Sequence, residues 1–162
     1  MRIRAASLED VPTLMALEKH AVTAAHWSVE QYQVAFSIQE PPRVALVIEE
    51  DAEVQGFLIA RAAKREWEIE NIAVAGPARR RGLGSRLLGE FLNTVLGQGG
   101  QAVFLEVRRS NLAARNLYEK WAFVESGCRK NYYHAPEEDA MTYRLDTRRL
   151  LHKSERAVTP AD

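Results

Sequence analysis

The stretch Arg79-Arg80-Arg81-Gly82-Leu83-Gly84-Ser85 decides the fold, because it separates an apolar run at residues 69–74 from an amphipathic run at 87–96. This order predicts a strand, a glycine-rich turn and a helix. Two glycines spaced by one residue let the backbone approach a ligand closely, and the first amides of a helix lack intrahelical partners. The helix dipole and the arginines favour an anion here, and a pyrophosphate is the natural one.

Other interpretations of these glycines compete with that one. A Walker loop requires Gly-Lys followed by Ser or Thr, and this triplet does not occur. A dinucleotide-binding fingerprint requires a third glycine where Leu87 stands, although Glu106 at the end of the next predicted strand could serve as its ribose-binding acid. A plain glycine turn beside solvated arginines also stays open on this stretch alone.

The composition indicates one domain. The chain has 162 residues, of which 46% are hydrophobic, and this is enough for a complete core. Lys and Arg number 22 and Asp and Glu number 22, so the chain lacks the positive excess that is typical of nucleic-acid binders. The single cysteine, Cys128, excludes an internal disulfide, and the four histidines have no ligand spacing, so no metal is expected.

The two ends of the chain give further expectations. The N-terminus has no apolar signal segment, and no run approaches the roughly twenty apolar residues of a membrane helix. We therefore expect a cytoplasmic protein with no membrane partner. Residues 147–162 are charged and poorly patterned, which predicts a flexible tail behind a domain of residues 1–146.

Periodicity and turn signals predict the other elements. Capping boxes at Ser7 and Ser28 predict the starts of two helices, the second ending near Phe36. The predicted strands are residues 3–5, 43–49, 54–63, 67–74, 102–107, 124–130 and 139–145, with further helices ending at Leu96 and covering 111–120. The order predicts an α+β fold, a mixed central sheet of about seven strands flanked by about four helices.

The chain resembles the GCN5-related N-acetyltransferase (GNAT) superfamily along almost its entire length. Arg79-x-x-Gly82-x-Gly84 matches the signature Gln/Arg-x-x-Gly-x-Gly/Ala. Other segments resemble the bacterial ribosomal-protein alanine N-acetyltransferases of the RimI type, namely Asn71-Ile72-Ala73-Val74, Leu105-Glu106-Val107-Arg108, Ser110-Asn111, Asn116-Leu117-Tyr118-Glu119, Arg129-Lys130-Asn131-Tyr132-Tyr133 and Glu138-Asp139-Ala140. Three positions depart from the family: Ala75-Gly76 replaces a frequent Asp-Pro, Ala122 a common glycine, and His26 a frequent proline.

The resemblance implies an acetyl-CoA-dependent N-acetyltransferase that acts on a protein α-amine. The acceptor it favours is the N-terminal alanine of a small-subunit ribosomal protein, and the mechanism is direct transfer in a ternary complex. Cys128 has no evident histidine partner, which disfavours a covalent acetyl-enzyme. An acetyltransferase for a lysine or a small amine, and a catalytically silent CoA-binding module, remain as alternatives.

Acetyl transfer from a thioester to an amine needs a base and an acid. Glu106 interrupts an otherwise buried strand and is the candidate base for an α-amine whose pKa is about 8. The alternative for Glu106 is a structural ion pair. Tyr118 is the candidate acid for the leaving thiolate, and core packing is its alternative on sequence alone.

The remaining candidate residues bind the two substrates. The backbone amide of Val74 is the candidate oxyanion donor. The resemblance implies that acetyl-CoA contacts Ile72, Ala73, Val74, Arg79, Arg80, Arg81, Gly82, Leu83, Gly84, Ser85, Asn111 and Tyr118, although Asn111 also reads as a helix N-cap. Trp27, Tyr132 and Tyr133 are the candidate walls of a groove for a peptide N-terminus, because tyrosines present flat surface with hydroxyls at the rim.

Overall fold

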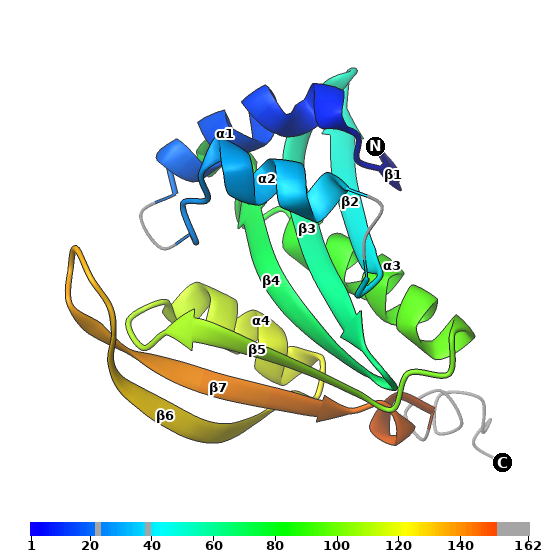
Figure 1. Cartoon of the computed structure of the whole chain (residues 1–162), viewed down its shortest axis with the longest axis vertical. Coiled ribbons are helices and arrows are strands. Elements are labelled where there is room, and N and C mark those ends of the chain that lie inside the picture. The colour runs from blue at the N-terminus through cyan, green and yellow to red at the C-terminus, as the bar shows by residue number, and fades with distance from the viewer. Residues whose placement is uncertain (22–23, 38–39, 152–162) are drawn as a thin grey trace, which may run out of the picture.

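A seven-stranded sheet forms the frame of the molecule in the computed structural model, which describes residues 1–21, 24–37 and 40–151. Its strands are β1 (Arg2–Ala5), β2 (Arg43–Glu50), β3 (Glu53–Ala63), β4 (Glu66–Val74), β5 (Ala102–Arg108), β6 (Val124–Tyr133) and β7 (Glu138–Asp146). The helices are α1 (Val11–Lys19), α2 (Val29–Phe36), α3 (Leu83–Gly97) and α4 (Leu112–Lys120), with 3-10 turns η1 (Leu8–Asp10) and η2 (Gly76–Ala78). The predicted single-domain α+β fold is confirmed (Figure 1). No helix of the described part is long and apolar enough to cross a membrane.

The sheet has the order β1-β2-β3-β4-β5-β7-β6. Its neighbouring strands are antiparallel except for β4 and β5, which are parallel and are joined through α3. A parallel pair needs such a crossover, whereas antiparallel neighbours can be joined by short turns. The glycine-rich turn therefore lies at the only crossover between paired parallel strands in the described sheet.

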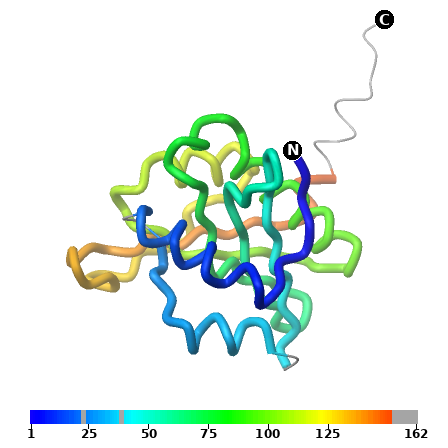
Figure 2. The backbone as a smooth tube through the Cα atoms, turned by 90° about the horizontal axis from the view of Figure 1, so that it is seen from above, coloured from blue at the N-terminus to red at the C-terminus, as the bar shows by residue number. Residues whose placement is uncertain are grey.

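Two hydrophobic cores lie on the two faces of the sheet. The larger core packs α3 and α4 against one face and includes Leu87, Phe91 and Tyr118. The smaller core packs α1 and α2 against the other face and includes Leu14, Tyr32 and Phe57. Seen from above, α2 and the turn before α3 lie at opposite sides of the molecule (Figure 2).

A β-bulge at Glu70 interrupts β4. Ile59 of β3 faces Asn71 while Ala60 faces Ile69, so Glu70 has no opposite residue. The extra residue reverses the alternation of side chains. Ile69 therefore belongs to the larger core, whereas Ala73, four residues later, belongs to the smaller core.

The pairing of β4 with β5 ends at the same place. The parallel register runs from Glu66 opposite Ala102 to Ile69 opposite Leu105 and goes no further. Beyond it, β4 stays paired with β3 as far as Val74, and β5 stays paired with β7 as far as Arg108. The two strands consequently separate toward their carboxyl ends (Figure 1).

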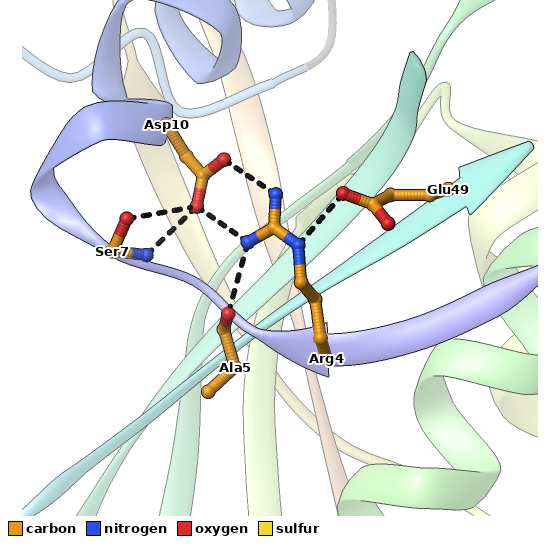
Figure 3. A network of polar contacts seen from close by, with 5 residues as sticks. All are labelled: Arg4, Ala5, Ser7, Asp10 and Glu49. Carbon is orange, nitrogen blue, oxygen red and sulfur yellow. Dashed lines mark hydrogen bonds and ion pairs between the residues drawn. The ribbon is translucent and has the colours of Figure 1, made fainter. Parts of the chain in front are cut away.

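An ion-pair network fixes the start of the chain (Figure 3). Arg4 of β1 donates to both carboxylate oxygens of Asp10, each at 2.8 Å, and its Nε donates to Glu49 of β2 at 2.7 Å. Asp10 also accepts from the backbone N–H of Ser7 at 2.8 Å. The hydrogen bonds from Arg4 are the largest cause of a lowered pKa of Asp10.

The C-terminus of α4 ends in a left-handed residue. Ala122 has φ of 67° and donates its N–H to Glu119 O at 3.0 Å, and Phe123 N–H donates to Tyr118 O at 3.1 Å. These bonds form a Schellman motif, in which glycine is the usual left-handed residue. The Phe123 ring packs 5.7 Å from the ring of Tyr118, so this cap also fixes the position of the candidate acid.

The edge strand β6 buries very little. Its side chains are exposed from its first residue up to Tyr132, and its register with β7 shifts twice. Within the predicted tail, Thr147 is buried and its hydroxyl donates to Gly100 O at 2.9 Å. Residues 152–162 of that predicted tail lie outside the described residues.

Candidate functional site

A cleft of about 1670 Å³ opens where β4 and β5 separate. It is lined by both strands, by the turn before α3, by α4, by the α1–α2 region and by the end of β6. Such a large concave site with converging polar groups is the usual form of a binding or active site.

The cleft connects the two faces of the sheet. Val103, Leu105 and Val107 of β5 face the larger core, so alternation turns Glu106 toward the opposite face. Tyr118 belongs to the larger core itself, yet both Glu106 and Tyr118 line the cleft. The candidate base and the candidate acid therefore reach one cavity from opposite faces, through the gap between the strands.

The glycine-rich turn has the geometry of an anion site. Gly82 is the N-cap of α3 with φ of 79°, and no side chain caps the first turn of the helix. The positive φ favours glycine at this position. At Gly84, a Cβ atom would lie 3.3 Å from Leu117 of α4, so a small residue permits the close approach of the two helices. Gly82, Gly84 and Ser85 all line the cleft.

The three arginines of the turn have different surroundings. Arg79 lines the cleft and donates from Nε to Val74 O at 3.1 Å. Arg80 also lines the cleft and has φ of 62°. Arg81 instead forms an ion pair with Glu50 of β2 at 2.8 Å and is not among the cleft-lining residues. The sequence predicts the same role for all three arginines, whereas in the structure only Arg79 and Arg80 of the three line the cleft.

Glu106 is ion-paired. Its Oε1 lies 2.9 Å from Nε of Arg129, and 18% of the Glu106 side chain is exposed against 61% for Arg129. The hydroxyl of Tyr132 also hydrogen-bonds to Glu106, and this bond is the main cause of a raised pKa of Tyr132. The carboxylate is therefore accessible from the cleft but held between two partners from β6.

Tyr118 is 3% exposed and packs against Phe123 and Tyr143, with ring centroids at 5.7 and 6.2 Å. Burial raises its pKa, chiefly by desolvation of the phenolate. The hydroxyl therefore stays protonated at neutral pH. Burial also makes the free energy of proton transfer to a thiolate less favourable than for a free tyrosine. An acid role for Tyr118 therefore requires that its hydroxyl be hydrogen-bonded directly to the sulfur.

The backbone of Val74 faces the gap. Ala75 N–H donates to Gln55 O of β3 at 2.8 Å, and backbone groups of consecutive strand residues point to opposite edges. The N–H and C=O of Val74 therefore point away from β3, toward the cleft. Asn111 lines the cleft as well, and its side chain accepts from Ala114 N at 3.2 Å, so it is the N-cap of α4.

The three predicted aromatic residues all line the cleft. Tyr132 and Tyr133 stack edge to face with ring centroids at 5.1 Å, and the Arg108 guanidinium lies 4.3 Å from the centre of the Tyr133 ring. The pKa of Tyr133 is raised to about 12, and desolvation by burial is the largest cause. Trp27 packs edge to face on Tyr32 at 5.3 Å. Both tyrosines line the cleft, and Tyr132 is the more exposed of the two.

Sequence reasoning missed a buried polar cluster beside this wall, which we call the Glu18 cluster: Glu18, Trp27, Tyr32 and Asn71. Glu18, 2% exposed in the last turn of α1, accepts from the Tyr32 hydroxyl at 2.6 Å and from Asn71 Nδ2 at 2.6 Å. It also accepts from the backbone N–H of Trp27 at 3.1 Å. The only signal in the sequence was Asn71 directly before the apolar residues 72–74 at the end of a predicted strand.

The structure thus gathers most of the predicted site residues around one cavity. Those that line it are Trp27, Ile72, Ala73, Val74, Arg79, Arg80, Gly82, Leu83, Gly84, Ser85, Glu106, Asn111, Tyr118, Tyr132 and Tyr133. Arg81 is the predicted residue that lies elsewhere.

Comparison with known proteins gives consistent relatives. The profile of the acetyltransferase (GNAT) family matches residues 11–123. A ribosomal protein bS18-alanine N-acetyltransferase from Salmonella typhimurium is 34% identical over 141 residues, which cover 86% of this chain and 93% of that protein. A putative enzyme of the same name from Bacillus subtilis is 30% identical, over 86% of this chain and 91% of its own. The crystal structure of the ribosomal-protein-S18-alanine N-acetyltransferase from Escherichia coli superimposes with a TM-score of 0.80 at 29% identity, covering 90% of this chain and 93% of that one.

Proposed function

Because this chain belongs to the GNAT acetyltransferase family, we propose that it transfers the acetyl group of acetyl-CoA to the N-terminal α-amine of a protein. The proposed acceptor is the N-terminal alanine of a small-subunit ribosomal protein, as the names of the relatives indicate for those proteins. The observation that carries the proposal is the cleft between β4 and β5, lined by Glu106 and Tyr118 from opposite faces of the sheet.

The two-faced cleft supports direct transfer in a ternary complex. The turn before α3 and the helix α4 line it from the face of the larger core, and this side suits a pyrophosphate and its pantetheine arm. The α1–α2 region and the tyrosines of β6 line the other side. Two substrates can then enter from opposite faces and meet in the gap, with no acetyl-enzyme between them.

Glu106 is the proposed base. An α-ammonium must lose a proton before its nitrogen attacks the thioester carbonyl, and a carboxylate at the acceptor side can take that proton directly or through water. The ion pair with Arg129 and the hydrogen bond from the Tyr132 hydroxyl hold this carboxylate at the cleft.

Tyr118 and Val74 are proposed to handle the charge on the other reactant. As the carbon–nitrogen bond forms, negative charge develops on the carbonyl oxygen, and the cleft-facing N–H of Val74 can stabilise it. When the carbon–sulfur bond breaks, the thiolate receives a hydrogen bond and then the proton from Tyr118. The raised pKa of Tyr118 keeps that proton in place until the sulfur becomes basic.

The acceptor side suits a peptide that begins with a small residue. Four alanines line it, Ala21, Ala24, Ala25 and Ala35, and they leave little bulk around the entering side chain. Trp27 and the paired tyrosines provide flat amphipathic walls for the first peptide groups.

The test is acetyl incorporation, measured by mass spectrometry, into three classes of acceptor. These are Ala-initiated peptides, the same peptides blocked at the N-terminus but carrying an internal lysine, and free small amines. We expect the fastest acetylation of the free α-amine, because its pKa is about 8 against about 10.4 for lysine. Faster acetylation of the blocked peptides or of small amines would show that the proposed acceptor is wrong, and it would not affect the assignment to the GNAT family.

A further inference from the structure

The carboxamide of Asn71 has an unused hydrogen-bond acceptor. Its Oδ1 is buried and has no hydrogen-bond partner among the described residues, while its Nδ2 donates to Glu18. Asn71 is 3% exposed as a whole. A buried polar atom without a partner is costly in the folded state, and such atoms in native structures call for an explanation.

Glu18 fixes which end of the amide is free. A carboxylate offers only acceptors, so the Asn71 carboxamide must turn its NH₂ group toward Glu18 and its oxygen away from it. Tyr32 and the backbone of Trp27 hold the other carboxylate oxygen, at 2.6 and 3.1 Å. The Glu18 cluster therefore specifies an orientation that a lone asparagine would not keep.

The position of Asn71 in the sheet places its side chain at the cleft, where a substrate could bind the free oxygen. Asn71 is the first residue after the bulge at Glu70, in the part of β4 that has no partner strand on the side of β5. It lines the same cleft as Glu106, together with Trp27 and Ala73. An amine or a peptide N–H that enters from the acceptor side is the donor that this site lacks.

We propose that Asn71 binds the acceptor through Oδ1, which accepts a hydrogen bond from the attacking amine or from the first amide N–H, and that Glu18 is a positioning residue that holds Asn71 in this orientation. The inference rests on the proposed acetyl transfer and adds an acceptor-binding group to it. A hydrogen bond from an ammonium group to this oxygen is charge-assisted and stronger than a neutral one.

Steady-state kinetics of Asn71→Ala with an Ala-initiated peptide tests the proposal. At saturating acetyl-CoA, we expect the KM for the peptide to rise about 10- to 100-fold, as for a lost hydrogen bond to a charged group. The kcat and the Kd for acetyl-CoA should stay close to the wild-type values, because the Asn71 side chain touches neither the base nor the glycine-rich turn. An unchanged KM for the peptide would overturn the proposal.

Two further variants distinguish a loss of acceptor binding from a general structural effect of mutations in this region. Glu18→Gln keeps the shape of the cluster but can donate to Asn71 Oδ1 after the asparagine turns over, so the KM should again rise. It carries the test if Asn71→Ala does not fold. Ser37, at the end of α2, belongs neither to the Glu18 cluster nor to the cleft lining. Ser37→Ala removes the hydrogen bond from its hydroxyl to Val34 O, so the KM of this variant should stay within about threefold of wild type. An equal rise in all variants would reduce the cluster to a structural role and contradict the proposal.

The acceptor panel distinguishes failure of this inference from failure of the proposed function. If the wild-type protein acetylates a free amine but no peptide, the proposed acceptor is wrong, and the rise in KM is sought with that amine. If it acetylates no acceptor, both proposals are overturned. If it acetylates the peptide and Asn71→Ala leaves the KM unchanged, only the role of Asn71 is overturned.

Discussion

Glu106 and Arg129 form an ion pair at 2.9 Å across the paired strands β5, β7 and β6, and most of the arginine side chain is exposed. An exposed pair of this kind contributes about 0.2–1 kcal/mol to stability. The burial and the position of Glu106 are therefore not accounted for by stability alone, and the two possible roles of this carboxylate can be separated experimentally.

We predict that Glu106→Gln lowers kcat by about 10²–10⁴-fold, the usual contribution of a general base. The loss should shrink as the pH rises above about 8, because the acceptor amine then deprotonates unaided. Arg129→Gln is the matched control, since it removes the ion pair and keeps the carboxylate, and it should retain most of the activity. Equal losses in both variants, measured from pH 6 to 10, would assign Glu106 a structural role.

Tyr118→Phe should lower kcat while acetyl-CoA binding and the melting temperature change little, because the ring contacts with Phe123 and Tyr143 remain. Tyr143→Phe is the control. Its hydroxyl donates to Glu119 and accepts from Arg115, and it does not line the cleft, so its loss should leave kcat near the wild-type value. A wild-type rate in Tyr118→Phe would refute the acid assignment.

Acetyl-CoA should raise the melting temperature more than NAD or ATP does, because the turn before α3 and the unpaired edge of β4 suit a pantetheine pyrophosphate. At a hundredfold excess over Kd, mass action predicts about 2.7 kcal/mol of stabilisation. Gly82→Ala should reduce this shift, since alanine in a left-handed conformation costs roughly 1–2 kcal/mol and the turn must adjust. Equal stabilisation by NAD would instead favour a dinucleotide site.

Ala122→Gly should stabilise the fold. The left-handed conformation costs alanine roughly 1–2 kcal/mol, whereas glycine loses only about 0.4–1 kcal/mol of additional entropy on folding. The free energy of unfolding from urea titration should therefore increase, by up to about 1.6 kcal/mol. Ala114→Gly, in the right-handed part of α4, is the control and should destabilise. A loss of stability in Ala122→Gly would show that packing of the Ala122 methyl group contributes more free energy than the left-handed conformation costs.

Asp10→Asn should destabilise the protein at neutral pH and much less in acid. The pKa of Asp10 is lowered in the folded state, chiefly by Arg4, so its contribution is present above the unfolded value of about 4 and is lost as the pH falls through the folded pKa. Urea unfolding of both proteins at pH 7, 5 and 3 measures the difference. Glu138, whose pKa is also lowered, titrates in both proteins and cancels. A difference that is constant down to pH 3 would exclude the charge of Asp10 as its origin.

The helices and strands could be predicted well from the sequence, because capping boxes, turn residues and hydrophobic periodicity each involve residues close together in the chain. The capping box at Ser28 is present, with Ser28 Oγ accepting from Gln31 N at 3.2 Å and Gln31 Oε1 accepting from Ser28 N at 2.8 Å. The glycine-rich turn and its crossover followed in the same way from spacing and periodicity. The predicted end of β6 at residue 130 was too early, since its pairing with β7 resumes at Tyr133 after a register shift.

Long-range pairing determined what the sequence did not reveal. The bulge at Glu70 depends on the register that β3 imposes, and it decides which side of the sheet Asn71 faces. Glu18 has the sequence context of an ordinary charged residue near a helix end, and only the approach of α2 and β4 buries it. Arg81 differs from its neighbours through Glu50, which is 31 positions away in the chain.

The unequal burial of the cleft walls has a consequence for motion. Helix α3 buries six large side chains, whereas β6 exposes almost all of its side chains at the edge of the sheet. Segments with few buried contacts open locally at lower free energies than core elements do. Amide hydrogens of β6 should therefore exchange with solvent before those of α3, so the cleft wall that carries Tyr132 can change shape more readily than the wall formed by the start of α3.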